Sequence, residues 1–497
     1  MLLSQLLGPE NPIPSSAGSL FVTGATADSR DVAPGFVFVA MPGSRTDGAR
    51  FVVDAARNGA VAAVVAAEAA LPDTLPLTVI RVADPRRTLA LMASRLFPAQ
   101  PETIVAVTGT SGKTSVAEFT RQIFAANGCA AASLGTIGVV KPAGAVYGSL
   151  TTPDPVALHQ TIDGLAHEGI THLACEASSH GLDQHRLDGV RLTAGAFTNL
   201  GRDHMDYHPT VEHYLAAKLR LFEELLQPGQ PVVVNMDGAY SQAAFEAARE
   251  RGLDVLTVGR AGRTLQLPAV ERDGFAQRLT VGFTGGGDGT ATVRLPLIGD
   301  YQVENALVAA GLAIATGIAP RDALMALETV KGVPGRLDIV GTVNGGLVVV
   351  DYAHKPEALA AALAGVRPFV TGKLISVFGC GGDRDKGKRP IMGRIAAAGA
   401  DVVIVTDDNP RSEVPAAIRA EIMAGAAGAR EIGDRAEAIE RAVALVAPGD
   451  VVLIAGKGHE TGQIVGDKVL PFSDHDVARA AIARHETAST GTSGSRA

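Results

Sequence analysis

The chain has 497 residues, of which 46% are hydrophobic and 19% charged, and its formal net charge is −8 at pH 7. This length and composition exclude a disordered protein and predict several folded domains rather than one. Aromatic residues make up only 4% of the chain and tryptophan is absent. Surfaces that stack nucleic-acid bases are therefore not expected, and the acidic balance also argues against a nucleic-acid partner.

Cysteine spacing and hydropathy favour a cytoplasmic protein. Cys129, Cys175 and Cys380 are far apart and show no C-x-x-C spacing, so we expect neither a disulfide framework nor a zinc knuckle. The opening MLLSQLLGPENPIPSS lacks the basic segment and the apolar length of a signal peptide. Uncharged apolar stretches of about 18 residues, the length needed to span a membrane, are absent from the sequence, so no membrane insertion is expected.

Residues 1–99 are expected to form a small α/β domain. The runs GSLFVTG, GFVFVAM and AVAAVVAA are typical of strands, and DGARFVVDAARNG has the spacing of an amphipathic helix. The segment RLFPAQPE, with its two prolines, suits a linker to the next domain.

Residues 100–333 repeat a strand–loop–helix pattern. The strands end in polar loops: TIVAVTG, THLACEASS, LTAGAFTNL and PVVVNMD. Such short apolar runs alternating with helices predict a parallel sheet, whose ligands collect at the carboxyl ends of the strands.

The segment KGVPGRLDIV predicts a second boundary, so the third domain covers residues 334–497. GLVVVDYAH, KLISVFGCGGD, DVVIVTDDNP and DVVLIAGKGHE repeat the same pattern, and the small polar tail from about residue 486 is expected to be disordered. The predicted fold class is therefore α/β with three domains: a central P-loop-type parallel sheet, an N-terminal α/β domain and a C-terminal Rossmann-like α/β domain. Clefts between such domains are the natural place for an active site.

The stretch AVTGTSGKTS, residues 106–115, predicts a nucleotide-binding loop. A strand precedes it and a helix follows, so backbone N–H groups and the helix dipole point at one spot where phosphate would bind. Lys113 could then reach the β- and γ-phosphates, and the Thr114 hydroxyl could bind magnesium. The alternative is an ordinary Gly/Ser turn, because Val107 stands where the usual P-loop has glycine and the loop glycine is Gly109 instead. The expected ATP-binding residues of the loop are Gly109, Thr110, Ser111, Gly112, Lys113, Thr114 and Ser115.

Two further stretches carry residues that could bind a metal. Glu176 ends the predicted strand HLACE, although an acid in this position is often an ordinary loop residue. The loop TNLGRDHMDYH contains Asp203, His204, Asp206 and His208, which could bind a cation or could simply be solvated. The spacing alone leaves both possibilities open.

Eleven motifs together resemble one family. They are, in chain order, TGTSGKTS, TTPDP, EASSHGLDQHR, TNLGRDHMDYH, YLAAKLRLF, ENALVAA, PGRLD, DYAHKPEAL, GCGGDRDKGKRP, DNPR and GKGHE. This order is similar to that of the Mur ligases of peptidoglycan synthesis, over roughly residues 20 to 475. The family's loop pattern, T-G-T-[NS]-G-K-[TS], has its glycine at the place of Gly109.

The resemblance implies a metal-dependent catalytic centre. Lys113, Glu176, His204 and Lys218 would be its catalytic residues, and Thr114, Glu176 and His204 would hold Mg²⁺. Lys218 would carry a carbamate derived from CO₂, which helps to bind a second Mg²⁺, since carbamylation turns a cation into an anion. On the pattern alone, Lys218 would be a solvated helix lysine.

The resemblance also implies contacts for the two nucleotides. Asn305 would hold the adenine of ATP, Arg336 a phosphate and Asp351 the ribose, with His354 lining the same cleft; each could otherwise be a capping or surface residue. The uridine-binding segment would include Ser29, whereas Ser44 and Arg45 replace the His-Gln of some relatives and leave the uracil contacts there open. The residues expected to hold the sugar and dipeptide of the UDP-linked substrate are Thr151, Thr152, Ser178, Gln184 and Arg186.

The third domain would select the incoming amino acid. Arg411 of DNPR can grip a carboxylate with two hydrogen bonds, and Glu460 of GKGHE can accept from an ammonium group. An arginine at this position favours diaminopimelate over lysine, which has no second carboxylate, although Asn-Pro alone also suits a plain turn. The expected diaminopimelate-binding residues are Arg384, Asp408, Asn409, Pro410, Arg411, Gly456 and Glu460.

The activity that the resemblance implies is addition of meso-diaminopimelate to UDP-MurNAc-L-Ala-D-Glu, with ATP converting the acid to an acyl phosphate and the third domain closing over the reactants. A cytoplasmic monomer acting on small molecules is expected. The alternatives are a related ligase that adds L-lysine or extends folylpolyglutamate, and a non-catalytic nucleotide-binding regulator.

Overall fold

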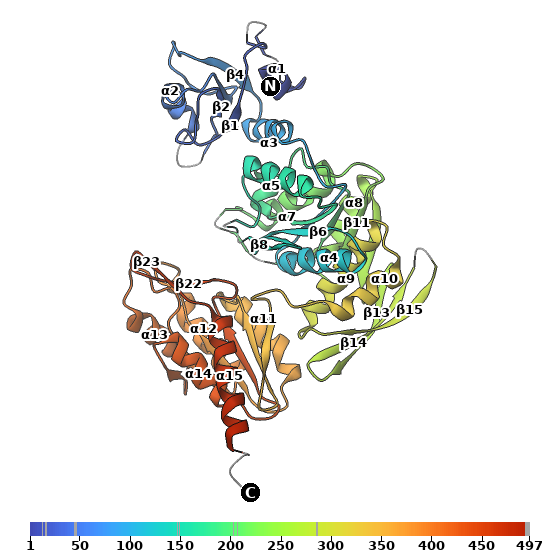
Figure 1. Cartoon of the computed structure of the whole chain (residues 1–497), viewed down its shortest axis with the longest axis vertical. Coiled ribbons are helices and arrows are strands. Elements are labelled where there is room, and N and C mark those ends of the chain that lie inside the picture. The colour runs from blue at the N-terminus through green and yellow to red at the C-terminus, as the bar shows by residue number, and fades with distance from the viewer. Residues whose placement is uncertain are drawn as a thin grey trace. The chain divides into compact units, whose positions relative to one another are not determined.

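The computed structural model describes residues 1–492, apart from 12, 15, 16, 44–46, 147, 149, 202, 206, 285 and 286. The chain divides into two compact units. The first unit comprises Met1–Gln266, Phe283–Gly287 and Leu307–Ala323, and the second comprises Leu267–Gly282, Asp288–Ala306 and Leu324–Ala497. Figure 1 colours the chain from blue to red along its length.

The first unit begins with a four-stranded parallel sheet in the order β1-β2-β3-β4. Its elements are α1 (Leu3–Leu7), β1 (Gly24–Thr26), β2 (Phe36–Val39), η1 (Gly48–Phe51), α2 (Val52–Arg57), β3 (Ala62–Ala66), β4 (Thr78–Val82) and α3 (Pro85–Leu96). The two central strands, β2 and β3, are short runs of Val, Ala and Phe that are largely buried on both faces, the pattern expected for a parallel sheet covered by helices. Helix α3 starts at Asp84, whose side chain accepts from the N–H groups of Arg86 and Arg87, and Pro85 occupies its first turn.

An eleven-stranded sheet follows, in the order β15-β14-β13-β12-β11-β10-β5-β9-β6-β7-β8. Strands β12, β11, β10, β5, β9 and β6 pair in parallel, and β7 and β8 extend the sheet as antiparallel strands. Their elements are β5 (Thr103–Thr108), α4 (Lys113–Ala126), β6 (Ala131–Gly135), β7 (Gly138–Lys141), β8 (Gly144–Val146), α5 (Pro155–His167), β9 (His172–Glu176), α6 (Ser179–Asp183), β10 (Ala194–Phe197), α7 (Val211–Arg220), the π-helical turn η2 (Leu221–Leu225), β11 (Pro231–Asn235), α8 (Ser241–Glu250), β12 (Asp254–Gly259), β13 (Leu265–Asp273), β14 (Ala276–Phe283), β15 (Gly289–Leu295), α9 (Asp300–Ala315), α10 (Pro320–Ala326) and η3 (Leu327–Thr329).

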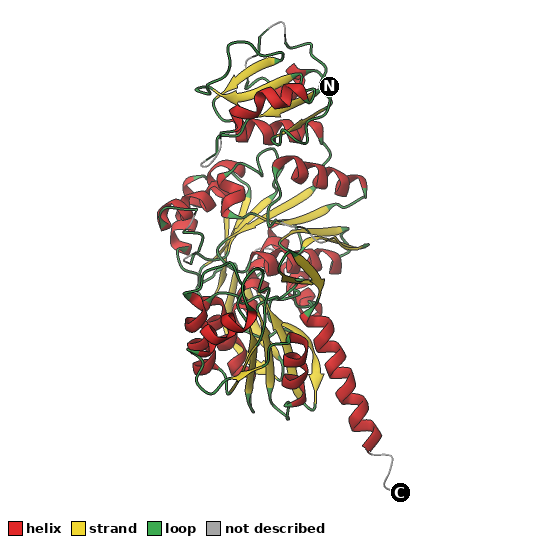
Figure 2. Cartoon of the chain, turned by 90° about the vertical axis from the view of Figure 1, so that its left-hand side faces the viewer, coloured by secondary structure: helices red, strands yellow, loops and turns green. Residues whose placement is uncertain are grey.

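The second unit contains a six-stranded sheet in the order β16-β17-β21-β18-β19-β20 and the hairpin β22–β23. All pairs in the sheet are parallel except β16–β17. Helices and strands alternate along the chain from β17 to β21, and Figure 2 colours the helices red and the strands yellow. Its elements are β16 (Asp338–Val343), β17 (Gly346–Asp351), α11 (Pro356–Val366), η4 (Arg367–Phe369), β18 (Leu374–Phe378), α12 (Lys388–Gly399), β19 (Val402–Val405), α13 (Pro415–Met423), β20 (Arg430–Glu431), α14 (Arg435–Ala444), β21 (Val451–Ala455), β22 (Gly462–Val465), β23 (Lys468–Pro471) and α15 (Asp474–Thr492).

The α/β class predicted from the sequence is confirmed, with three successive sheets built on parallel strands. One detail differs at the C-terminus, where a disordered tail was expected from about residue 486. Helix α15 continues to Thr492 because extending a formed helix costs less than nucleating one, even though residues 486–492, ETASTGT, are mostly weak helix formers. Residues 493–497 of the predicted tail lie outside the described residues. Within the described part of the chain, the helices are too short or too polar to cross a bilayer.

Candidate functional site

The loop between β5 and α4 has the backbone geometry of a phosphate-binding turn. Gly109 and Gly112 both have positive φ angles, +146° and +87°, and Gly112 is the N-cap of α4. A Cβ atom on Gly109 would collide with Thr198 Oγ1 at the end of the neighbouring strand β10. Glycine is therefore required at position 109, which explains why the loop glycine stands there and not at Val107.

Hydrogen bonds to the chain after β10 hold this loop in place. Thr110 N donates to Asn199 O at 2.9 Å, and Ser111 N donates to Asn199 Oδ1 at 3.1 Å. Thr198 Oγ1 donates to Ser111 O at 2.7 Å. The loop thus keeps its open shape through bonds to its neighbour, and Thr114 and Ser115 are buried in the first turn of α4.

Two lysines meet at the loop. Lys113 Nζ donates to Gly109 O at 2.9 Å and to Thr110 O at 3.0 Å. Lys218, on α7, donates to the same Gly109 oxygen at 2.7 Å, and its Nζ lies 4.4 Å from the centroid of the Tyr214 ring. The Tyr214 hydroxyl is 3.1 Å from Thr110 Oγ1, so α7 is bonded to the loop at two points.

Lys218 is not the solvated helix lysine that its pattern alone would indicate, since it is only 1% exposed. Burial lowers its pKa well below the usual value for lysine; the charge of Lys113 adds to this effect and that of Asp203 opposes it. A lowered pKa increases the fraction of lysine present as the neutral amine, which is the form that reacts with CO₂.

Glu176 lies at the end of β9, next to β5 in the sheet. It is 1% exposed, and its Oε1 accepts from the Thr136 backbone N–H at 2.6 Å. Gly135 leaves room for this carboxylate, since a Cβ atom there would collide with Glu176 Oε1. The sequence placed Glu176 at a strand end, and the parallel pairing brings that end beside the nucleotide loop.

His204 follows β10 in a backbone conformation unusual for a side-chain-bearing residue, with φ +56°. Its N–H donates to Asp203 Oδ1 at 2.8 Å, and its ring packs edge-on against the His180 ring with centroids 4.9 Å apart. His208 lies in the same loop with its ring nitrogen Nδ1 2.9 Å from His213 Nδ1, and Asp206 lies outside the described residues. The described residues contain no group of three or more His, Cys, Asp or Glu side chains that could hold a metal.

The residues expected to bind magnesium include a threonine and a carbamylated lysine as well as Glu176 and His204. The lack of a group made only of His, Cys, Asp and Glu among the described residues therefore does not test this set. Glu176 supplies carboxylate oxygens, Thr114 a hydroxyl and His204 an imidazole nitrogen. Lys218 is buried, with a lowered pKa. It would become an oxygen ligand after reaction with CO₂, and oxygen ligands are those that Mg²⁺ prefers. The chemistry of these residues fits the ion.

The five residues expected to hold the sugar and dipeptide form one connected hydrogen-bond network. Thr152 Oγ1 donates to the Glu176 carbonyl oxygen at 2.9 Å and accepts from Ser178 N and Ser178 Oγ, both at 3.1 Å. Arg186 Nη1 donates to Thr152 O at 2.6 Å, and Arg186 Nη2 donates to Gln184 Oε1 at 2.8 Å. The structure thus brings Thr152, Ser178, Gln184 and Arg186 together beside Glu176.

Thr151 joins this network through Thr136, whose hydroxyl oxygen lies 3.0 Å from Thr151 Oγ1. The two hydrogen-bond acceptors of Arg186 are neutral, and burial lowers the pKa of its guanidinium group, although the charge of Asp154 opposes that shift. A half-buried cation held by neutral groups favours an anionic ligand.

Of the residues singled out for uridine binding, the structure describes only Ser29. Ser29 lies in the turn after β1 and its carbonyl oxygen accepts from Asn58 Nδ2 at 2.8 Å. Ser44 and Arg45, for which the sequence left the uracil contacts open, lie outside the described residues.

The remaining residues expected to bind ATP lie in the second unit. Asn305, on α9, is buried, and its Nδ2 donates to Gln302 Oε1 at 3.1 Å; Gln302 Nε2 donates to Arg336 O at 2.7 Å. The Arg336 guanidinium lies 5.3 Å from the centroid of the Tyr352 ring. Asn305 and Arg336 are therefore linked through Gln302, a residue that the sequence analysis did not select.

Asp351 and His354 flank Tyr352 at the end of β17. Asp351 Oδ2 accepts from Leu337 N at 2.8 Å, and burial raises the pKa of this carboxyl group to about 6, against the lowering effect of Arg336. His354 Nδ1 is 2.8 Å from the Tyr352 carbonyl oxygen, and burial lowers the pKa of its imidazole.

The DNPR and GKGHE motifs lie side by side, after β19 and β21. Asn409 Nδ2 donates to Glu460 Oε2 at 2.8 Å, and Asn409 Oδ1 accepts from Lys457 Nζ at 2.9 Å and from Ile464 N at 2.9 Å. Asn409 and Arg411 have φ angles of +44° and +53°, which these contacts stabilise. Arg411 N also donates to Ile464 O at 3.1 Å, so the hairpin strand β22 fixes this loop.

Both arginines expected to bind the amino acid lie against Gly381. A Cβ atom on this glycine would be 2.8 Å from Arg411 Nη1 and 3.7 Å from Arg384 Cγ. Arg411 Nη1 donates to Gly382 O at 2.9 Å, and Arg384 Nη1 donates to Asp383 O at 3.1 Å. Two guanidinium groups with carbonyl acceptors at one loop suit a carboxylate ligand.

The other residues predicted to bind the amino acid lie near Asn409. Gly456 has a φ of +123°, and a Cβ atom there would come within 2.5 Å of Asp408 Oδ2. Asp408 and Pro410 are buried, and the Pro410 carbonyl oxygen accepts from Glu413 N at 3.1 Å. Gly456 is therefore required by the close approach of Asp408.

Lys457 is a candidate functional residue that the sequence analysis missed. Its side chain is fully buried, and its Nζ lies 3.4 Å from Asp408 Oδ1, 2.9 Å from Asn409 Oδ1 and 3.5 Å from Glu460 Oε2. The residue stands in the quoted motif GKGHE, but the pattern gave no sign that its ammonium group joins three of the predicted pocket residues. Tyr352, whose hydroxyl donates to Glu460 Oε1 at 3.5 Å, was missed in the same way.

Comparison with known proteins identifies a family for this chain. Three family descriptions match the chain: Mur ligase family, catalytic domain, at residues 21–96; Mur ligase middle domain at 107–313; and Mur ligase, glutamate ligase domain, at 335–458.

Two bacterial relatives are similar over almost their whole length. UDP-N-acetylmuramoyl-L-alanyl-D-glutamate–2,6-diaminopimelate ligase from Bradyrhizobium diazoefficiens is 60% identical, covering 97% of this chain and 99% of the relative. The ligase of the same name from Brucella melitensis is 59% identical, with 95% and 96% covered.

Solved structures give the same result. A structure of a ligase of that name superimposes with a TM-score of 0.73 and 31% identity, covering 98% of this chain and 99% of the other. A folylpolyglutamate synthase from Mycobacterium tuberculosis, solved with ADP and AMPPCP, has a TM-score of 0.60 at 16% identity, with 80% and 94% covered, and shares the fold alone.

Proposed function

The chain belongs to the Mur ligase family, and from that premise we propose that it joins meso-diaminopimelate to the D-glutamate γ-carboxylate of UDP-MurNAc-L-Ala-D-Glu at the expense of ATP. The observation that carries the choice of amino acid is that Arg411 and Arg384 both lie at Gly381, while Glu460 is bonded to Asn409, two residues before Arg411. This arrangement offers cationic groups for a carboxylate and an anionic group for an ammonium, which suits the far end of diaminopimelate.

Amide formation from a free carboxylate needs activation, because an oxide ion is a poor leaving group. Transfer of the ATP γ-phosphoryl group to the acid gives an acyl phosphate, which the amine attacks with loss of phosphate. Lys113 would neutralise charge on the phosphoryl group during transfer, while the N-terminus of α4 binds the phosphates. The products are ADP, phosphate and a tripeptide-linked UDP-sugar.

Two Mg²⁺ ions would be held by Thr114, Glu176, His204 and carbamylated Lys218. When bound, they would supply positive charge that reduces repulsion between ATP and the carboxylate substrate. The burial and lowered pKa of Lys218 support its proposed carbamylation, since a neutral amine is the nucleophile in that reaction.

The acid substrate would bind beside Glu176 through Arg186. Its guanidinium would pair with a carboxylate of the dipeptide, and Thr151, Thr152, Ser178 and Gln184 would supply hydrogen bonds to hydroxyl and amide groups. The bonds that connect these five residues to one another support a common role.

In the second unit, Asn305, Arg336, Asp351 and His354 would contact the adenosine and phosphate groups of ATP. Arg384, Asp408, Asn409, Pro410, Arg411, Gly456 and Glu460 would bind the amino acid. Because one chain supplies residues for every substrate, we propose a monomer, and the need for ATP supports a cytoplasmic location.

The test is a substrate comparison with the purified protein. ATP, Mg²⁺ and UDP-MurNAc-L-Ala-D-Glu are supplied with meso-diaminopimelate, L-lysine or L-glutamate, and amide product and ADP are measured together. We expect product with meso-diaminopimelate at a kcat/KM at least about a hundredfold above that with lysine, since lysine leaves the arginines without a carboxylate. Equal use of lysine would overturn the proposed specificity.

A further inference from the structure

The segment that carries Gln184 and Arg186 turns sharply at the residue between them. His185 has a φ of +58°, a left-handed conformation that a residue with a side chain rarely adopts. Backbone bonds close the turn: His185 N donates to Leu182 O at 3.1 Å, and Arg186 N donates to Gly181 O at 2.8 Å. The conformation of His185 therefore sets the directions of Gln184 and Arg186, which are bonded to each other.

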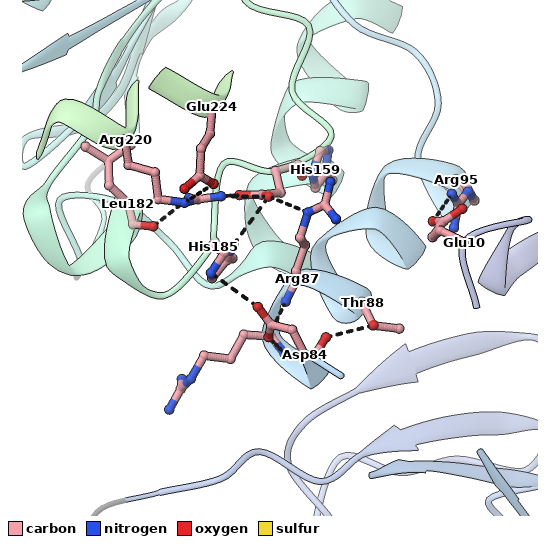
Figure 3. Close-up of polar contacts among 12 residues, drawn as sticks. Glu10, Asp84, Arg87, Thr88, Arg95, His159, Leu182, His185, Arg220 and Glu224 are labelled. Carbon is pink, nitrogen blue, oxygen red and sulfur yellow. Dashed lines mark hydrogen bonds and ion pairs between the residues drawn. The ribbon is translucent and has the colours of Figure 1, made fainter. Parts of the chain in front are cut away.

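The ring of His185 is held between two carboxylates. Its Nε2 lies 3.2 Å from Asp84 Oδ2, and its Nδ1 lies 3.4 Å from Asp188 Oδ1. Asp84 is the N-cap of α3, whose N–H groups bond to its other oxygen, Oδ1. One carboxylate thus caps a helix with one oxygen and contacts the turn with the other (Figure 3).

Asp188 is a buried junction of the same turn. Both of its carboxylate oxygens accept from Arg220 Nη2, at 2.8 and 2.7 Å, and Oδ1 also accepts from Arg87 Nε at 3.2 Å. Its carbonyl oxygen lies 2.9 Å from His159 Nε2 on α5. Arg87 belongs to α3 and Asp84 is its N-cap, so this end of the helix provides both a carboxylate and a guanidinium group to the turn (Figure 3).

Arg220 extends the junction to α7, the helix that carries Lys218. Its Nη1 donates to the Leu182 carbonyl oxygen at 2.6 Å, one turn before His185 (Figure 3). Helices α3 and α7 therefore both contact the segment with Gln184 and Arg186, through charged groups and not through apolar packing alone. If these charged groups served only to attach α3 to the rest of the domain, they would not need to contact His185, the residue with the left-handed backbone.

We propose that Asp84, Arg87 and Asp188 are positioning residues: they fix the His185 turn and so hold Arg186 and Gln184 in the orientation that binds the dipeptide carboxylate. The inference rests on the proposed function, because it assigns the turn to the acid substrate. It makes α3 a determinant of affinity for that substrate although α3 need not touch it.

Asp84→Ser is the test variant, since serine also caps a helix but is too short to reach His185. We expect the KM for UDP-MurNAc-L-Ala-D-Glu to rise about threefold to tenfold, as for loss of one hydrogen-bonded contact, with kcat and the KM for ATP changed less than about twofold. Asp84→Asn, which keeps the length and can still bond His185, should recover part of the loss. Asp54→Asn, which removes an exposed pair with Arg57 in the same sheet region, is the matched control and should resemble wild type.

Equilibrium binding of UDP-MurNAc-L-Ala-D-Glu without ATP should weaken by the same factor in Asp84→Ser. Unchanged binding and KM in that variant, with an active wild type, would overturn the inference. So would a general loss in which kcat, both KM values and the Tm change together, because that is the result of a purely structural role. A wild-type protein that neither binds nor ligates this substrate would instead refute the proposed function.

Discussion

Lys113 and Lys218 donate hydrogen bonds to one and the same oxygen, the carbonyl of Gly109. They come from the helix after the loop and from α7, a hundred residues further along, and they bring two amines together at the point where phosphate is proposed to bind. Burial and the charge of Lys113 both lower the pKa of Lys218. The arrangement favours a neutral Lys218, and its conversion to an anionic carbamate would add an attraction between that group and the Lys113 ammonium.

The first prediction concerns that carbamate. Lys218→Ala should lower kcat by about a hundredfold or more, because the variant loses an anionic ligand of the proposed metal site. Acetate or formate should restore part of the activity by taking the place of the carbamate. Lys141→Ala, at an ion pair with Glu168, is the control and should keep normal kcat. Wild-type activity in Lys218→Ala without added acid would contradict the role.

The second prediction concerns the displaced loop glycine. Gly109→Ala should lower kcat/KM for ATP by about a hundredfold, because the new methyl group collides with Thr198 and shifts the phosphate-binding turn. Gly128→Ala is matched to it, since Gly128 also has a positive φ but open space around it. That control should lose only about 1 kcal/mol of stability, measured by thermal unfolding, and keep its activity. Similar kinetics in both variants would argue against the loop's role.

The third prediction separates the two ends of the amino acid. Arg411→Ala should lower kcat/KM for meso-diaminopimelate by about a hundredfold to a thousandfold, while the low activity with lysine changes little, because lysine lacks the group that Arg411 would bind. Arg394→Ala, at an exposed position on α12, provides the control. Equal losses with both amino acids would place Arg411 outside the discrimination.

The fourth prediction concerns Lys457, which the structure adds to the pocket. Lys457→Met should raise the KM for meso-diaminopimelate, because Asn409 and Glu460 lose a shared partner, and it should destabilise the protein by about 3 kcal/mol, since buried Asp408 loses its counter-charge. Steady-state kinetics and thermal unfolding test the two effects separately. An unchanged KM alongside a lowered Tm would make Lys457 purely structural.

The fifth prediction is a pH dependence. Burial raises the pKa of Asp351 from an ordinary value near 4 to about 6 in the folded protein. Between these values the folded protein keeps a proton that the unfolded chain releases, so stability from this group is complete at low pH and is lost as pH rises to about 6. The Tm of Asp351→Asn relative to wild type should therefore increase by several degrees, roughly 5 °C, from pH 4 to pH 7. A constant difference across this range would contradict the raised pKa.

The sequence predicted features that follow from residues close together in the chain, such as strands and the loops at their ends, and features that follow from the order of known motifs. Glu176 and the nucleotide loop were placed at strand ends, and the parallel pairing of β5 with β9 makes these ends adjacent. The need for glycine at position 109 could be explained only from the structure, because its cause is Thr198 on another strand.

Residues whose roles depend on distant contacts escaped sequence reasoning. From the sequence, Lys457 is an ordinary loop lysine; its partners are known only once β19 and β21 are placed on either side of β18 in the sheet. Asp188 lies outside the eleven recognised motifs. Its carboxylate nevertheless accepts hydrogen bonds from Arg87 on α3 and Arg220 on α7, which are 101 and 32 residues away in sequence. Hydrophobic periodicity carries no information about such polar partners.

The central claim is that this protein consumes ATP to form one particular amide bond. The most direct measurement incubates the purified wild-type chain with ATP, Mg²⁺, UDP-MurNAc-L-Ala-D-Glu and meso-diaminopimelate, and follows ADP and product by mass spectrometry. We predict one ADP for each tripeptide-linked product, and no product when any one reactant is omitted. Absence of both ADP and amide from the complete mixture would contradict the account.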